Sequence, residues 1–129
     1  MTHPLTAALL GGLLAVGSLV AEARAEGSGS ATLDAARARG QLVCGVSGDI
    51  AGFALPDSKG VMRGLDADSC RAIAAAVFGD ASKVKFVNLT TQNRFTALQS
   101  GEVDVLIRST TWTLGREANL GALFAGINY

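Results

Sequence analysis

Three short apolar runs alternate with helical patterns along this chain, and this order constrains the fold more than any other feature. The runs occupy residues 41–46, 84–89 and 103–107, with the sequences QLVCGV, VKFVNL and VDVLI. Each is bounded by glycine or polar residues and has the length of a buried strand. A β-α-β-α-β order with short connections predicts an α/β fold with a parallel sheet and right-handed crossovers.

The helical segments and one turn carry their own local signals. Residues 33–39, 66–78 and 91–100 are expected to be helices, and the second has an apolar face formed by Cys70, Ile73, Ala74, Val77 and Phe78. Side-chain caps are expected at Thr32, Asp66 and Thr91. Glycines that end the helices are expected at Gly40, Gly79 and Gly101. Residues 56–60, PDSKG, predict a turn before a short strand at residues 61–65.

The loop that follows the third apolar run is rich in guanidinium and hydroxyl groups. Ligands of open α/β sheets bind outside the carboxyl ends of the strands, where this loop is expected to lie. A guanidinium offers a planar fork of donors that matches a carboxylate. The candidate residues for binding a small anion are Arg108, Ser109, Thr110, Thr111 and Arg116. Alternatively, Arg116 is a solvated helix residue paired with Glu117, and the threonines only cap a helix.

The loop after the first run, residues 47–53, is the second candidate. Gly48 and Gly52 permit a tight backbone beside a ligand, Asp49 can bind an ammonium group, and Phe53 can pack over an apolar part. Alternatively, this is a surface loop with Asp49 in water and Phe53 in the core.

Composition argues against several other function classes. Eleven Lys and Arg residues balance eleven Asp and Glu residues, which disfavours a nucleic-acid surface. No phosphate-binding P-loop, no G-x-G-x-x-G after the first run and no cysteine–histidine pair is present. His3 is the single histidine, and it precedes the expected cleavage site described next. We expect no cofactor, no metal and no catalytic residue.

The first 25 residues predict a secretory signal peptide. Residues 5–20 are almost wholly apolar or small, and Ala23-Arg24-Ala25 forms a small-x-small cleavage site. No Lys or Arg precedes the apolar run. The alternative is a transmembrane anchor, for which the run is short and rich in glycine. Residues 26–31, EGSGSA, are then expected to be a flexible leader.

Export changes the interpretation of the two cysteines, Cys44 and Cys70. An oxidising compartment favours a disulfide between them. Two buried thiols or a redox pair are the alternatives, and the absence of C-x-x-C disfavours the redox pair.

Two longer stretches resemble a known family. RFTALQSGEVDVL followed by TTWTLGR is similar to the family 3 periplasmic solute-binding proteins of polar amino-acid ABC transporters, and among them to the general L-amino-acid-binding branch. The similarity covers essentially all of residues 32–129. The resemblance implies the type II periplasmic-binding-protein fold, in which two lobes, each a three-layer α/β unit with a mainly parallel sheet, close on one amino acid. It also places a cysteine pair at Cys44 and Cys70.

The resemblance assigns roles and partners. It implies that Thr111 and Arg116 hold the α-carboxylate, with Ser109 near the ammonium side of the ligand or near its carboxylate. It also implies that residues 48–53 line the side-chain end of the pocket. The implied partners are a free L-amino acid and an inner-membrane permease, for a periplasmic protein that is a monomer when complete and is not an enzyme. The alternatives are a dehydratase-like enzyme acting on cyclic acids and a ligand-sensing domain.

A member of that family continues beyond the point that corresponds to Tyr129. The continuation forms a second lobe, whose acidic residue binds the ligand ammonium, and then returns to complete the first lobe. We therefore expect residues 32–129 to be the N-terminal part of lobe 1, either as a fragment or as a truncated product that is marginally stable alone.

Overall fold

A computed structural model describes residues 29–121 and 124–125 of the chain. The predicted signal peptide and residues 26–28 of the predicted leader lie outside the described residues. The helices are α1 (Ala31–Arg39), α2 (Leu65–Phe78), α3 (Arg94–Gln99) and α4 (Leu114–Leu120). The strands are β1 (Leu42–Val46), β2 (Leu55–Pro56), β3 (Met62–Arg63), β4 (Val84–Asn88) and β5 (Val105–Leu106). None of the helices described is long and apolar enough to cross a membrane.

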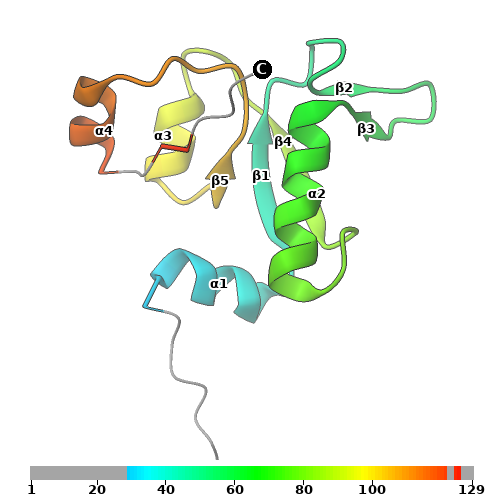
Figure 1. Cartoon of the computed structure of the whole chain (residues 1–129), viewed down its shortest axis with the longest axis horizontal. Helices are drawn as coiled ribbons and strands as arrows, with labels where there is room; N and C mark the ends of the chain where they lie inside the picture. Colours follow the sequence, from blue (N-terminus) through cyan, green and yellow to red (C-terminus); the bar gives the residue numbers. More distant parts are fainter. Residues whose placement is uncertain (1–28, 122–123, 126–129) are drawn as a thin grey trace, which may run out of the picture.

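The main sheet is parallel, as the alternation predicts. Its strand order is β4-β1-β5, and Cys44 in the middle of β1 pairs with Phe86 of β4 and Val105 of β5. The third strand pairs over only two residues, fewer than the expected run of residues 103–107. The strands β2 and β3 form a separate antiparallel hairpin around the predicted turn. Figure 1 shows α1 at one end of β1 and this hairpin near the other.

Both faces of the sheet are covered, which gives three layers. On one face Leu42, Cys44 and Val46 of β1 pack with Ala67 and other small residues of α2. On the opposite face Val43 of β1 packs with a second cluster that includes α3. This is the arrangement expected when successive side chains of a strand point to opposite faces.

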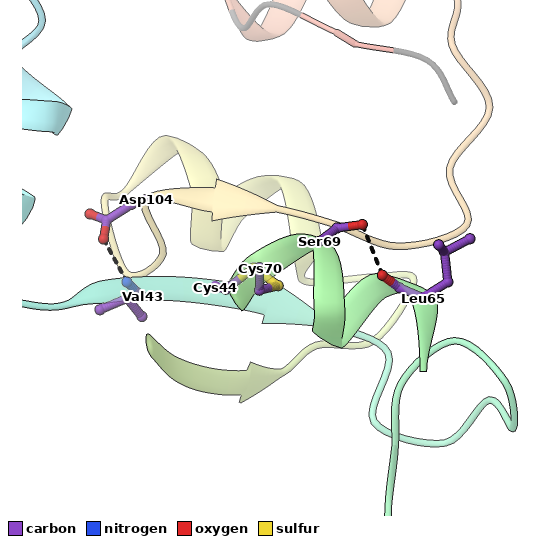
Figure 2. The surroundings of a disulfide bond; sticks show 6 residues. All are labelled: Val43, Cys44, Leu65, Ser69, Cys70 and Asp104. Atoms are coloured by element: carbon purple, nitrogen blue, oxygen red, sulfur yellow. Dashed lines mark hydrogen bonds between the residues drawn. A yellow bond between two sulfur atoms is a disulfide. The ribbon is translucent and has the colours of Figure 1, made fainter. Parts of the chain in front are cut away.

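A disulfide joins β1 to α2. Cys44 and Cys70 are bonded, their Cα atoms are 6.1 Å apart and neither side chain is exposed. Figure 2 shows the bridge between the strand and the helix. The predicted disulfide is therefore confirmed.

Helices α1 and α2 end where the glycines predict, whereas α3 ends at Gln99 with Ser100, not Gly101, as its cap. The three helices begin at other residues than predicted. Gly40 and Gly79 adopt left-handed backbone conformations directly after α1 and α2. Ser30, not Thr32, caps α1 by accepting from the Leu33 N–H. In α3 the cap residue is Asn93, whose side-chain oxygen accepts from the Thr90 N–H.

Asp66 is not the cap of α2. The helix begins at Leu65, preceded by Gly64, and has no side-chain cap. Instead, the carbonyl of Gly52 accepts from the Leu65 N–H at 2.9 Å, and the carbonyl of Phe53 accepts from the Asp66 N–H at 3.0 Å. A Cβ on Gly64 would lie 2.4 Å from the Phe53 oxygen, so only glycine fits there. The loop after β1 thus satisfies the exposed donors of the helix, and Asp66 is buried in its first turn.

Candidate functional site

The candidate site lies at the carboxyl edge of the main sheet. The loops after β1, β4 and β5 meet there, because parallel strands end on the same side. A hollow of about 290 Å³ opens between them. It is lined by Ser47, Asp49, Asn88, Leu89, Thr90, Thr91, Gln92 and Arg108.

Two of the predicted site residues, Asp49 and Arg108, line this hollow. Asp49 is exposed, at the rim, as the alternative interpretation of its loop allows. The Nη1 of Arg108 donates to the carbonyl oxygen of Leu89. Since β5 and β4 flank β1, the Arg108 side chain crosses the end of the central strand.

Gly48 and Phe53 have structural roles in the loop after β1. The backbone of Gly48 has φ +76°, and a Cβ there would lie 2.3 Å from the side chain of Asn88. Gly48 therefore lets Asn88 approach the loop closely and line the hollow. Phe53 is half-buried, and its carbonyl caps α2 as described above.

Two more arginines, Arg94 and Arg116, contact the segment after Arg108. Arg116 in α4 donates from Nη1 to the Thr111 carbonyl at 2.6 Å, and Arg94 at the start of α3 donates from Nη1 to the Ser109 carbonyl at 3.3 Å. Both guanidiniums lie over the ring of Phe95, at 5.4 and 4.9 Å from its centroid. Arg94 is thus hydrogen-bonded to the predicted segment, although no sequence pattern distinguishes it.

The alternative, in which Arg116 pairs with Glu117 and the threonines cap a helix, agrees with the structure only in part. Thr113 caps α4, accepting from the Arg116 N–H at 3.2 Å. Glu117, however, accepts from the indole N–H of Trp112. The ion pairs found among the described residues involve Arg39, Arg63 and Arg71, so Arg116 is not paired with Glu117 there.

Buried polar atoms without a partner gather at this edge. Within the described part of the chain, five buried side-chain atoms make no hydrogen bond: Ser47 Oγ, Asp66 Oδ2, Arg94 Nε, Arg108 Nε and Thr110 Oγ1. All five follow the carboxyl end of a strand or lie in the first turn of α2 or α3. A buried polar atom without a partner is costly, so such atoms mark a place where a polar ligand gains most from binding.

Burial and neighbouring charges shift the pKa values of two groups at this edge. Burial lowers the pKa of Arg94 from its ordinary value, and the charges of Arg108 and Arg116 lower it further. Burial also raises the pKa of Asp66, while the charge of Arg108 opposes that shift. The edge therefore concentrates positive charge with one buried carboxylate beside it, an environment that favours an anionic ligand.

Sequence reasoning missed the residues after β4. Asn88 and the segment 90–92 line the hollow, yet their polar composition predicted only a helix start. Ligands bind outside the carboxyl ends of the strands, and this holds for the second apolar run as for the first and third. The position of these residues after the second run could therefore have indicated them. Thr91, expected to be a cap, is exposed and lines the hollow instead.

Comparison with known proteins gives a consistent family. The profile of the bacterial extracellular solute-binding proteins, family 3, matches residues 42–122. The glutamate/glutamine/aspartate/asparagine-binding protein BztA of Rhodobacter capsulatus is 53% identical over 88% of this chain and 34% of its own length. The general L-amino acid-binding periplasmic protein AapJ of Rhizobium johnstonii is 46% identical over 89% of this chain and 34% of its own.

A solved structure extends the likeness to the fold. A periplasmic binding protein from Brucella ovis, solved with glutathione bound, is 58% identical with a TM-score of 0.73, over 78% of this chain and 31% of that one. The expected fold class, mixed α/β with a mainly parallel sheet as in type II periplasmic binding proteins, is therefore confirmed. The chain spans about a third of the length of the relatives that it matches.

Proposed function

The chain belongs to the bacterial extracellular solute-binding proteins, family 3, and we propose that it forms the ligand-binding edge of one lobe of a periplasmic amino-acid receptor. In the complete protein this lobe and a second one would close on a free L-amino acid and deliver it to an ABC-transporter permease. The relatives BztA and AapJ, both named as amino-acid-binding proteins, support this ligand class.

One observation carries the proposal. The unpaired buried polar atoms of the described residues gather at the carboxyl edge of the sheet, beside three guanidiniums without an ion pair among those residues. A carboxylate accepts several charge-assisted hydrogen bonds at once, and so it suits this edge better than a neutral group does. We assign no chemical step to the edge, which makes binding, rather than a dehydratase-like reaction, the proposed activity.

The residues take distinct roles in this proposal. Arg116 contributes its remaining donors to the α-carboxylate, since only its Nη1 is engaged with the Thr111 carbonyl. Ser109 and Thr111 are exposed residues of the same segment, and their hydroxyls add donors. Residues 48–53 form the wall toward the ligand side chain.

Titration of the complete protein with L-amino acids tests the site assignment. Arg116→Ala should weaken binding about tenfold or more, because a charge-assisted hydrogen bond contributes about 1.5–3 kcal/mol. Arg37→Ala is the matched control, since Arg37 is exposed on α1 at the opposite end of β1. Unchanged affinity in the Arg116 variant would remove Arg116 from the site.

A further inference from the structure

Phe95, in the first turn of α3, lies against two of the arginines at the carboxyl edge. The guanidinium carbon of Arg94 is 4.9 Å from the centroid of its ring, and that of Arg116 in α4 is 5.4 Å from it. Figure 1 shows α4 beside α3, in agreement with this contact between the two helices. The face of an aromatic ring carries partial negative charge and attracts a cation that lies over it. The ring therefore connects Arg116 to a second helix.

The Arg116 side chain has few other polar contacts that fix its direction. It is half-buried, and the ion pairs found among the described residues do not include it. Its guanidinium donates one hydrogen bond, from Nη1 to the Thr111 carbonyl. A guanidinium matches a carboxylate only when its planar fork faces the two oxygens. The ring of Phe95 adds a contact with the face of the guanidinium carbon, which restricts how that plane can turn.

The same ring also opposes a repulsion between the two arginines. The positive charges of Arg108 and Arg116 lower the pKa of Arg94, in addition to the effect of its burial. Repulsion of this kind favours an Arg116 side chain that turns away from Arg94 into water. Phe95 attracts both cations and so favours the arrangement in which Arg116 stays at the carboxyl edge.

We propose that Phe95 is a positioning residue, whose ring holds the Arg116 guanidinium in the orientation that receives the α-carboxylate of an amino acid. A side chain that is already held loses less rotamer freedom when the ligand binds, so the affinity is higher. A phenyl ring offers no polar atom to a carboxylate, so Phe95 acts through Arg116. This inference rests on the proposed function and adds a residue to the site that it describes.

Substitutions that separate the ring from its volume test this role. Calorimetric titration of the complete protein with L-glutamine, which has a single carboxylate, should show binding about threefold to fivefold weaker in Phe95→Leu than in the wild type. Phe95→Met should show the same loss, so a leucine variant that does not fold leaves the test in place. Phe95→Tyr keeps the ring and should bind within about 1.5-fold of the wild type.

Phe86→Leu is the matched control for loss of a phenyl ring beside an arginine. The guanidinium carbon of Arg71 is 5.3 Å from the centroid of the Phe86 ring, nearly the distance found between Arg116 and Phe95. Phe86 packs with the cluster on the α2 face of the sheet, whereas α3 lies on the opposite face. This variant should therefore bind L-glutamine as the wild type does.

A double-mutant cycle identifies the residue through which Phe95 acts. In an Arg116→Ala background, Phe95→Leu should weaken L-glutamine binding by less than about 1.5-fold, because the partner of the ring is already absent. In an Arg94→Gln background, Phe95→Leu should still weaken binding about threefold.

The outcomes separate this inference from the proposed function. Wild-type affinity in a folded Phe95→Leu variant, an equal loss in Phe95→Tyr, or an undiminished loss in the Arg116→Ala background would each overturn the inference. Wild-type protein that binds no L-amino acid, or unchanged affinity in Arg116→Ala alone, would instead overturn the proposed function or its site.

Discussion

The disulfide between Cys44 and Cys70 should contribute a large share of the stability of this lobe. The two cysteines are separated by 26 positions and link the central strand to the helix that covers it. In the chain-entropy model, a loop of this length stabilises the folded state by about 3.5 kcal/mol. That is a substantial fraction of the roughly 5–15 kcal/mol by which a typical domain is stable.

Urea unfolding of the oxidised and reduced proteins, followed by circular dichroism, measures this contribution. Reduction leaves both sulfur atoms in the core, so the difference reports the cross-link and not a cavity. The Cys44→Ala/Cys70→Ala variant should lose somewhat more, because the missing sulfurs leave unfilled space, and it should not respond to reductant. Oxidised and reduced wild-type proteins that agree within about 1 kcal/mol would refute this reasoning.

Two further predictions concern the carboxyl edge. Burial raises the pKa of Asp66, so its contribution to stability is fully present below the unfolded value near 3.8 and is lost as pH rises through the folded pKa. Asp66→Asn should therefore raise the melting temperature at pH 7 and change it little near pH 3, whereas a lower value at pH 7 would show that attraction to Arg108 dominates. Gly48→Ala and Gly52→Ala should each cost about 1–2 kcal/mol, because both glycines have positive φ. Only the first should weaken amino-acid binding, since its methyl group displaces Asn88; equal affinities in the two variants would contradict this.

The sequence predicted local features better than features that depend on tertiary contacts. Gly40 and Gly79 end their helices because glycine tolerates a positive φ whatever its surroundings. The sequence predicts the cap of α2 two residues too late, because the donors of the first turn are satisfied by carbonyls of residues 52 and 53, more than ten positions away. No local pattern contains that information.

The site was predicted in part for the same reason. The residues after β1 and β5 stood out by composition, and Asp49 and Arg108 do line the hollow. Arg94 looked like an ordinary helix residue, and only burial and the contact with Ser109 distinguish it. That Arg108 reaches Leu89 follows from the strand order β4-β1-β5, which the sequence does not specify.

The most direct measurement is a titration of the complete protein with L-glutamate and with its α-amide, in which the α-carboxylate alone is neutralised. If the carboxyl edge binds the α-carboxylate of an amino acid, glutamate should bind and the α-amide should bind at least about tenfold more weakly. Equal affinity for the two compounds would contradict the assignment of this edge as the site of the α-carboxylate.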